Sequence, residues 1–434
     1  MTAVQDERIA PRAPVGVPRL LVGDPDGRGS LDEHERAHGA LPFVDPAAML
    51  DELEHSGLAG RGGASFPAAT KWRAVGSRRG SAVVVANGCE GEPASHKDKL
   101  LLTRFPHLVL DGLEIAAMTL RARDVVLAVE RTRPDVADSV ARAISERVSR
   151  RRDAIVPRVA GVPARYVAGE ESALVHWLNG GDAKPTNAPP RPFERGVSGR
   201  PTLVQNVETL AHVALVARHG APWFRSVGTV DEPGSMLVTI SGAVRSPGVC
   251  EVAFGTSITD LVARSGGARG ALSAALVGGY FGTWLPAAVL DDVNLSRADL
   301  RPRGAAPGCG VVVAFPAGAC GLLETARVTH YLARETAGQC GPCVNGLGAI
   351  ASAMDELATT SASAARVREI ERWTAMIANR GACHHPDGAI RFVRSALDTF
   401  RDEIDRHAHR TCSARTGSPV LPVPSPRASN SGWR

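Results

Sequence analysis

The spacing of apolar positions changes along the chain and divides it into regions of different predicted structure. Short valine-rich or alanine-rich runs, VVVAN at 83–87, DVVLAVE at 124–130 and ARYVAG at 164–169, alternate with glycine turns and helical stretches. Alternating strand and helix patterns are typical of α/β layer structures. We therefore predict a Rossmann-like α/β domain over residues 49–228.

The next region contains mostly strand patterns. Residues 235–267 show a strand pattern, a Pro-Gly turn, a second strand pattern and a helix. Ser257 and Asp260 fit a capping box at the start of that helix, and a Gly-Gly pair ends it. Further strand patterns occur in ALVGGY and VVVAF. The simplest prediction is a small mixed β domain packed on one helix, a β-grasp arrangement, over residues 233–318.

Helical spacing dominates from Gly321 onward. Apolar residues repeat at spacings of three and four from Val367 to Ile377 and again from Ile390 to Ile404. This period indicates amphipathic helices. We predict a bundle of about four helices over residues 319–410, with loops at GQCGPC, TTSAS and RGACHHPDG.

The two ends differ from these regions in composition. Residues 1–48 are rich in Pro, Gly and charge and predict an extended arm, whereas the Pro/Ser-rich residues 411–434 predict a disordered tail. The N-terminus lacks the apolar core of a signal peptide, and no apolar run reaches the roughly 18 residues of a membrane span. We expect a soluble, cytoplasmic protein.

Composition narrows the possible functions. The 434 residues carry 50 basic and 45 acidic side chains, a net charge of +5 that is spread along the chain, so nucleic acid is not indicated. Eight cysteines are too few for a secreted disulfide scaffold of this length. Three of them, Cys340, Cys343 and Cys383, fall in the helical region, where clustered cysteines indicate metal binding or catalysis.

A glycine-rich loop precedes the first strand. GLAGRGGASFPAATKW, residues 57–72, places four glycines just before a helical run that starts near Pro67. Glycines allow backbone N–H groups to approach a ligand closely, and a helix N-terminus with Arg61 favours an anion, to which Lys71 can add a charge. The loop is a candidate phosphate cradle, with an ordinary turn as the alternative.

Polar residues also follow two of the predicted strands. VVVANGCEGEP carries Asn87, Cys89, Glu90 and Glu92 after a buried strand, and YVAGEES carries acidic residues that open a helix. Ligands of open α/β folds bind at the carboxyl ends of strands. A solvated loop explains the first group equally, and the helix dipole explains the acidic residues of the second.

Taken together, these motifs resemble a known family. GLAGRGGASFPAATKW, NGCEGEP followed by HKDK, YVAGEES, GRPTLVQNVETL and AGQCGPC occur in its order and spacing. The family is the NADH-binding, flavin-carrying 51 kDa subunit of respiratory complex I, with its relatives in soluble hydrogenases and formate dehydrogenases. The resemblance covers about residues 50–410, and the β-grasp domain is called SLBB in that family.

The resemblance implies FMN, an iron-sulfur cluster and NADH as donor, with electrons passed to a ferredoxin-like electron-transfer protein or subunit. The residues implied around FMN are Gly60, Arg61, Gly62, Gly63, Lys71, Asn87, Glu90, Gly91, Tyr166, Gly169, Glu170, Gln205 and Asn206. Those implied to contact NADH are Phe66, Glu92 and Glu171. A flavin accepts a hydride and releases single electrons, while the protein orients and tunes it.

The sequence departs from the family pattern around the nucleotide. Cys89 stands where the family has Asp, and Ala188 to Arg191 stand where it has Lys-Pro-Pro-Phe. Loss of an aromatic stacking partner weakens nucleotide binding more than flavin binding. Three interpretations therefore remain: an NADH-oxidising flavoprotein, a flavoprotein reduced by ferredoxin or another donor, and a non-catalytic docking module.

The family cluster motif, C-x-x-C-x-x-C with one later Cys, has Ala337 at its first position. Cys340, Cys343 and Cys383 match the other three. Such a set can hold a [4Fe-4S] cluster with His384 or His385 as the fourth ligand, or a [3Fe-4S] cluster. Zinc on the three cysteines and His384, a redox pair and an empty site are the alternatives.

Overall fold

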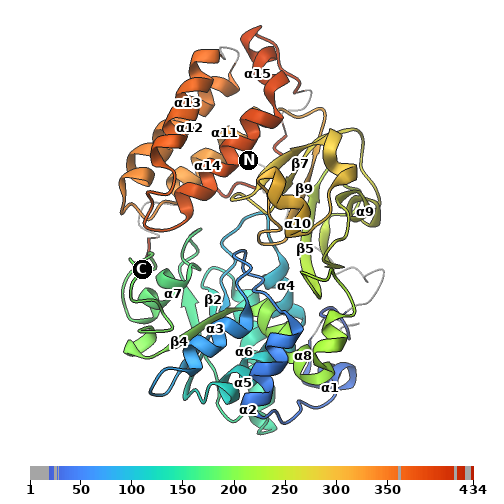
Figure 1. Cartoon of the computed structure of the whole chain (residues 1–434), viewed down its shortest axis with the longest axis vertical. Helices are drawn as coiled ribbons and strands as arrows, with labels where there is room; N and C mark the ends of the chain where they lie inside the picture. Colours follow the sequence, from blue (N-terminus) through green and yellow to red (C-terminus); the bar gives the residue numbers. More distant parts are fainter. Residues whose placement is uncertain (1–18, 24–26, 28, 360–362, 415–417, 426–431) are drawn as a thin grey trace.

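The computed structural model describes residues 19–23, 27, 29–359, 363–414, 418–425 and 432–434. Of the arm predicted at 1–48, residues 1–18, 24–26 and 28 lie outside the described residues. The molecule is elongated, with the α/β region at one end, the helical bundle at the other and the β-grasp region beside their junction (Figure 1). None of the described helices combines the length and apolar character that a bilayer crossing requires.

The α/β region is built on a parallel four-stranded sheet in the order β3-β2-β1-β4. Its strands are β1 (Val83–Gly88), β2 (Asp124–Glu130), β3 (Arg158–Val162) and β4 (Thr202–Asn206). Its helices are α1 (Leu31–His38), α2 (Pro46–Ser56), α3 (Ala68–Gly76), α4 (Lys97–Arg104), α5 (Pro106–Thr119), α6 (Pro134–Ser149), α7 (Glu171–Leu178) and α8 (Val207–Arg225), with a 3-10 turn at Val197–Gly199.

The predicted strands at 83–87 and 124–130 are present, but the one predicted at 164–169 is not. The chain forms β3 at Arg158–Val162 instead, and residues 166–169 form turns. Pro163 directly follows β3 and cannot donate a hydrogen bond to a neighbouring strand, so it ends the strand. The prediction failed because the ARYVAG pattern was apolar enough to resemble a strand.

The β-grasp region contains a mixed five-stranded sheet in the order β6-β5-β9-β7-β8. Its strands are β5 (Ser235–Gly242), β6 (Gly248–Ala253), β7 (Leu272–Val277), β8 (Thr283–Pro286) and β9 (Val311–Pro316), and its helices are α9 (Ile258–Arg264) and the short α10 (Arg297–Leu300). Two 3-10 turns, Ala287–Asp292 and Arg301–Arg303, complete it. The Ser257 hydroxyl accepts a hydrogen bond from Asp260 N–H at 3.0 Å, as the capping pattern predicted.

The bundle consists of α11 (Gly321–Arg334), α12 (Gly348–Ala358), α13 (Ala364–Ile377), α14 (His385–Thr399) and α15 (Arg401–Ala408), with a π-helical turn at Pro342–Leu347. The apolar repeat from Ile390 to Ile404 predicted one helix, but it is divided at Phe400 (φ −107°, ψ 33°). The aromatic ring of Phe400 packs where a side chain on Gly321 would lie. Packing against α11 thus fixes the break.

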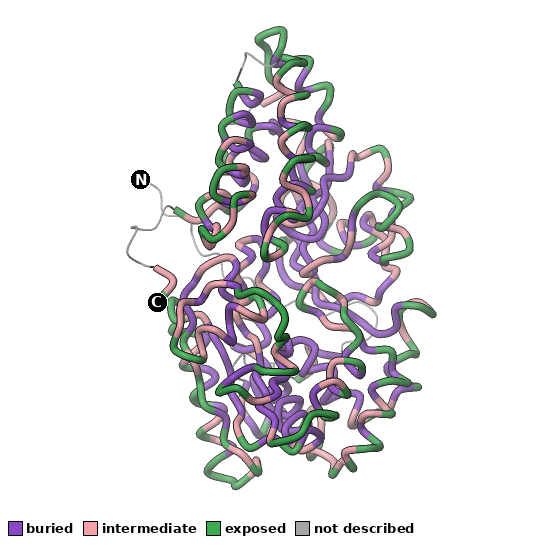
Figure 2. The backbone as a smooth tube through the Cα atoms, turned by 60° about the vertical axis from the view of Figure 1, so that its left-hand side comes forward, coloured by how far each residue is buried: buried purple, intermediate pink, exposed green. Residues whose placement is uncertain are grey.

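The β-grasp sheet is covered on both faces. One face shares a core with the bundle through Leu276, Trp284 and Phe315, and the other packs on α9. The backbone N–H of Trp284 also donates to the Ser395 hydroxyl of α14 at 3.0 Å. Buried segments accordingly run through all three regions (Figure 2).

The predicted disordered tail makes specific contacts where it is described. Leu421 is buried, and its N–H donates to Glu324 Oε2 of α11 at 2.9 Å. The Tyr280 hydroxyl donates to the Pro422 carbonyl at 2.6 Å. Residues 418–425 therefore connect the bundle with the β-grasp region.

Gly112 on α5 offers a test of the packing inside the α/β region. A Cβ at this position would lie 1.9 Å from the Leu210 carbonyl oxygen of α8. We expect Gly112→Ala to destabilise the protein by on the order of 3 kcal/mol, because backbone on both helices must move. Thermal unfolding followed by circular dichroism measures the effect.

Gly348→Ala is the matched control for Gly112→Ala. Gly348 opens α12, is exposed and has no atom within 4 Å of an added Cβ. Replacing this helical glycine should raise stability by about 0.5–1 kcal/mol. Equal effects of the two substitutions would contradict the proposed close approach of α5 and α8.

Candidate functional site

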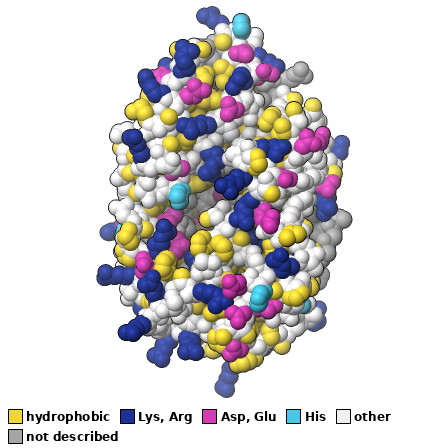
Figure 3. Space-filling model, viewed as in Figure 1, with side chains coloured by type: hydrophobic (Ala, Val, Ile, Leu, Met, Phe, Trp, Pro, Cys, Tyr) yellow, Lys and Arg dark blue, Asp and Glu magenta, His cyan; other side chains and the backbone are white. Residues whose placement is uncertain are grey.

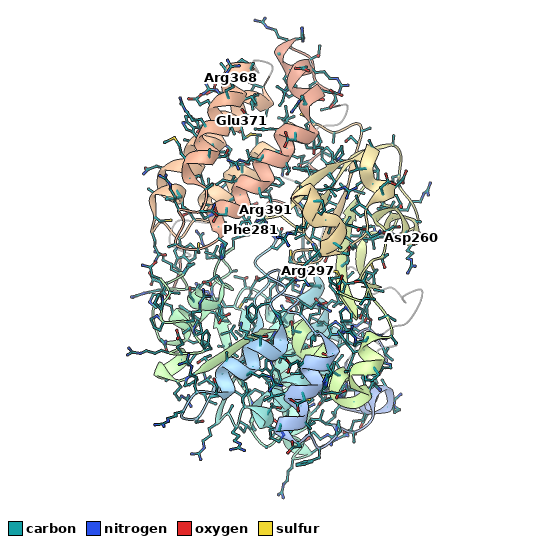
Figure 4. The ribbon with its side chains drawn as sticks, viewed as in Figure 1. Asp260, Phe281, Arg297, Arg368, Glu371 and Arg391 are labelled. Carbon is teal, nitrogen blue, oxygen red and sulfur yellow. The ribbon has the colours of Figure 1, made fainter. Side chains whose placement is uncertain are left out.

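The three regions meet at a cavity of about 460 Å³, within the range of pockets that bind cofactors. Figure 3 shows this face hollowed near its middle, with Lys and Arg side chains at the rim. Phe281 from the β-grasp region and Arg391 from α14 meet there, and Arg391 Nη1 donates to the Phe281 carbonyl at 3.0 Å (Figure 4). The cavity is thus bounded by side chains from separate parts of the chain.

The carboxyl ends of two neighbouring strands contribute amide side chains to this cavity. Asn87 on β1 is directly opposite Asn206 on β4, and both line the cavity. Asn87 Nδ2 donates to the Gly169 carbonyl at 2.8 Å, and Asn206 Nδ2 donates to Asp98 Oδ2 at 2.7 Å. These contacts orient both side chains at the same edge of the sheet.

Two loops approach one another so closely that only glycine fits between them. A Cβ on Gly91 would lie 2.6 Å from the Tyr166 carbonyl oxygen, and one on Gly169 would lie 3.0 Å from the Cys89 carbonyl oxygen. Both glycines line the cavity, together with Glu90 and Glu170. The motifs NGCEGEP and YVAGEES therefore form one continuous wall.

The glycine-rich loop lines the cavity with Arg61, Gly62 and Gly63, and Gly63 has the left-handed φ of +105° that favours glycine. The guanidinium of Arg61, however, donates to the Ser235 carbonyl at 3.0 Å and to the Ala59 carbonyl at 3.0 Å. Burial lowers its pKa to about 10. The expected role of the Arg61 side chain in holding an anion is replaced by a contact between two regions.

Five other predicted residues do not line the cavity: Gly60, Phe66, Lys71, Glu171 and Gln205. Lys71 Nζ pairs with Glu171 Oε2 at 2.5 Å, and Phe66 is 53% exposed. The Oε1 atom of Gln205 is buried and has no hydrogen-bond partner among the described residues. The sequence motif did not distinguish these neighbours from the residues that face the cavity.

Lys97 is a cavity residue that the sequence analysis did not select. Its ammonium contacts Asp98 Oδ1 at 2.7 Å and Glu208 Oε2 at 2.9 Å. Burial opposes its charge, but these carboxylates outweigh burial and raise the pKa of Lys97. Burial raises the pKa of Asp98 to about 6, against the attraction of Lys97. The HKDK stretch contained the signal, a lysine beside an aspartate after the strand-end motif.

Glu92 joins the walls of the cavity. Its Oε2 accepts from the Tyr166 hydroxyl at 2.8 Å and from Tyr280 N–H at 2.7 Å, and its Oε1 accepts from Ala94 N–H at 3.1 Å. Burial raises the pKa of Glu92 to about 7 although these donors favour the charged form. Glu92 was implied to contact NADH, and it lines the cavity as well as linking the α/β and β-grasp regions.

The three predicted metal-ligand cysteines interact electrostatically. Burial raises the pKa of Cys343 to about 12, opposed by a hydrogen bond from Thr336 and reinforced by Cys340 and Cys383. Cys340 and Cys343 flank the start of the π-helical turn, and Cys383 lies in the loop before α14, where it also lines the cavity. Three cysteines can supply three of the four ligands of an iron-sulfur cube.

The family motif would supply the fourth cluster ligand from its first cysteine, which is Ala337 in this chain. Ala337 offers no ligand atom. His384 borders the cavity, whereas His385 Nε2 is hydrogen-bonded to the Leu332 carbonyl at 2.8 Å and its Nδ1 is buried without a hydrogen-bond partner among the described residues. Burial lowers the pKa of His385 to about 4, so the ring is neutral at physiological pH.

The cavity residues suit a flavin. Amide groups of Asn87 and Asn206, the carboxylate of Glu170, and the backbone of Gly62 and Gly63 border one space of suitable volume. Backbone N–H groups of a glycine-rich loop can bind a phosphate without Arg61. The residues present therefore fit FMN.

Comparison with known families assigns both parts of this site. The Nuo51 FMN-binding domain matches residues 53–215, and the NADH-ubiquinone oxidoreductase-F iron-sulfur binding region matches residues 324–407. The F subunit of NADH-quinone oxidoreductase from Rickettsia felis is 30% identical over 384 residues, covering 84% of this chain and 90% of the relative. The chain belongs to the family of NADH-quinone oxidoreductase F subunits.

Further relatives support this assignment. The Escherichia coli member of the family is 28% identical over 393 residues, covering 87% of this chain and 88% of the relative. An NAD+-reducing [NiFe]-hydrogenase in its H2-reduced state has a chain that superimposes with a TM-score of 0.76 at 31% identity, over 84% of this chain. This chain spans 62% of that hydrogenase chain, less than two thirds of its length.

These matches confirm the predicted resemblance, the α/β fold class, and the FMN-binding and iron-sulfur-binding character expected of this family. They also confirm an NADH dehydrogenase-like oxidoreductase as the class of enzyme. The departure at Ala337 is a feature of this chain within an otherwise matching iron-sulfur region.

Glu92 predicts a pH dependence of stability. Its carboxyl binds its proton more tightly in the folded protein, so its contribution to stability is fully present below its ordinary pKa of 4.5 and is lost as the pH rises through about 7. Glu92→Gln removes this loss. We expect the stability of the variant relative to the parent to increase from pH 5 to pH 8 by on the order of 1–3 kcal/mol.

Thermal unfolding of both proteins at the two pH values measures this difference. Glu371→Gln, at an exposed position on α13 that is labelled in Figure 4, is the control and should show the same difference at both pH values. A relative stability of Glu92→Gln that does not change with pH would show that Glu92 is ionised throughout.

Proposed function

We propose that this chain oxidises NADH at FMN bound in the cavity and passes electrons to an iron-sulfur cluster held by Cys340, Cys343 and Cys383. The acceptor we propose is a ferredoxin-like electron-transfer protein or subunit in the cytoplasm. The observation that carries the proposal is that Cys383 borders the same cavity as Asn87 and Glu170. The proposed cluster ligand and the proposed flavin-binding side chains thus border one cavity.

The bound flavin would supply the conversion of a hydride into single electrons. The residues of the chain bind and orient it: Asn87 and Asn206 present amide groups held by Gly169 and Asp98. Glu92, Tyr166 and Phe281 close the wall around it, and this closure limits access of water. Of the predicted flavin-binding set, we assign this role to the members that line the cavity, except the side chain of Arg61.

The activities of the relatives support NADH as the donor. These relatives are a subunit of an NADH-quinone oxidoreductase and a chain of an NAD+-reducing hydrogenase. Arg391 at the rim is a cation that can pair with a dinucleotide phosphate. Reduced ferredoxin is the second candidate donor, favoured by Arg191 in place of the family aromatic residue.

The deciding experiment is anaerobic reconstitution with FMN, iron and sulfide, followed by addition of NADH, NADPH or reduced ferredoxin. We expect NADH to bleach the flavin absorbance fastest. Failure of the protein to bind FMN would exclude the proposal, whereas bleaching by ferredoxin alone would replace the donor and retain the flavin site.

Gly91→Val tests the flavin site directly. Its side chain would enter the close contact with the Tyr166 carbonyl, so we expect loss of at least about 90% of bound FMN through displacement of the cavity wall. Flavin content after reconstitution measures the loss. Gly318→Ala, where an added Cβ has no atom within 4 Å, is the control and should bind FMN normally. Unchanged FMN content in Gly91→Val would place the flavin elsewhere.

Ala337→Cys tests the cluster. This substitution restores the first cysteine of the family motif and so supplies a fourth thiolate ligand. It should raise the iron and sulfide bound per chain and slow cluster loss in air, because a cube with four thiolate ligands is more completely coordinated. Iron analysis and EPR measure the gain. Ala349→Cys adds a thiol on neighbouring α12 and should have no effect. No gain in bound iron for Ala337→Cys would count against a cluster at this site.

A further inference from the structure

A second group of metal-ligating side chains lies in the bundle, and it contains none of Cys340, Cys343 and Cys383. The ligand atoms of Cys320, Glu403, His407 and Cys412 all lie within 4.8 Å of one another. Cys320 is the N-cap of α11, Glu403 and His407 are one turn apart on α15, and Cys412 follows α15. α15 lies at the end of the molecule away from the α/β region (Figure 1).

The distances between these ligand atoms suit an ion with tetrahedral coordination. Cys320 Sγ lies 3.6 Å from His407 Nε2, and Glu403 Oε1 lies 3.2 Å from the same nitrogen. A zinc tetrahedron with Zn–S bonds of about 2.3 Å and Zn–N and Zn–O bonds of about 2.1 Å has edges of about 3.5 Å between such atoms. Cys320 and Glu403 are thus spaced from His407 as in such a tetrahedron, and the ligand atom of Cys412 lies within 4.8 Å of all three.

The surroundings orient the ligands. His407 Nδ1 is hydrogen-bonded to the Leu357 carbonyl of α12 at 2.8 Å, which directs the Nε2 lone pair toward Cys320 and Glu403. Glu403 Oε1 accepts from Ser413 N–H at 2.7 Å, and Cys320 Sγ accepts from Leu323 N–H at 3.5 Å. Outer hydrogen bonds of this kind are typical of metal sites.

The imidazole ring and the carboxylate are almost completely enclosed. The side chains of His407 and Glu403 are 1% and 6% exposed, and Cys320 is also buried. Burial, reinforced by the neighbouring Cys412 and Glu403, raises the pKa of Cys320 to about 12. A bound cation would reverse this preference and stabilise the thiolate.

We propose that Cys320, Glu403, His407 and Cys412 bind one zinc(II) ion. Two thiol protons are released to solvent as the two Zn–S bonds form, and no electron is transferred. Thiolate, imidazole and carboxylate ligands in a closed set of four are those of structural zinc. The ion ties the residues after α15 to the start of α11 and, through His407, to α12. This proposal does not depend on flavin or NADH.

Zinc binding by the full-length protein tests the proposal. The protein is purified under reducing conditions, stripped with a chelator and titrated with zinc(II) and with cobalt(II). We expect one tightly bound zinc per chain from this site, a thiolate-to-cobalt charge-transfer absorption, and a higher unfolding temperature with zinc. Cys412→Ser should weaken zinc binding by more than about 100-fold and remove the thermal shift, because it removes a direct ligand.

Cys412 is exposed, so its substitution leaves the folded core intact. Cys250→Ser, at a half-buried cysteine on β6, and Cys343→Ser, in the other cysteine group, should keep the zinc and the thermal shift. His407→Gln should lose both, as Cys412→Ser does.

Three results would overturn the proposal. The parent protein could bind no zinc, or the zinc could be lost in Cys343→Ser and retained in Cys412→Ser, which would assign it to the other cysteines. Alternatively, mass spectrometry of alkylated peptides could show a Cys320–Cys412 disulfide in protein purified under reducing conditions, which would make the pair a redox site.

Discussion

The buried carboxylate of Glu208 holds the separate parts of the cofactor site in place. It opens α8 at the end of β4, contacts the Lys97 ammonium at 2.9 Å and accepts the Leu237 N–H of β5 at 2.8 Å. Its Oε1 also lies 4.0 Å from Arg61 Nε. The loop after β1, the glycine-rich loop and the β-grasp sheet are therefore all positioned by one side chain. Breaking such a buried pair typically costs about 3–5 kcal/mol.

This arrangement explains why a flavin pocket can form from polar residues that are themselves hydrogen-bonded. The cations of Lys97 and Arg61 balance the carboxylates of Asp98 and Glu208 beside the cavity. The Asn206 amide and the backbone of the glycine-rich loop therefore remain to present neutral donors. The charged residues determine the shape of the cavity, and the neutral groups provide recognition. The Arg61 guanidinium helps to determine the shape of the cavity, although its sequence motif suggested a role in ligand recognition.

The sequence predicted those features that depend on local patterns. β1, β2 and the Ser257 cap follow from spacing and residue type. Asn206, which lies opposite Asn87, was implied only by the family resemblance, because no strand was predicted at β4. The directions of the Arg61 and Lys71 side chains could not be predicted from local patterns, because their partners Ser235 and Glu171 are distant in the chain. The same holds for Cys320 and His407, which are separated by 87 positions and have no recognisable spacing.

The position of Tyr280 limits how the molecule can move. Its N–H donates to Glu92 in the cavity wall, and its hydroxyl donates to Pro422 in the segment that also binds α11. A hinge between the bundle and the β-grasp region would break the second contact, and a hinge between the β-grasp and α/β regions would break the first and the Glu208 contacts. A hinge motion between the regions is therefore an unfavourable way to open the cavity to an electron donor. A nucleotide would enter a preformed opening, and its binding would change side-chain positions more than the angles between regions.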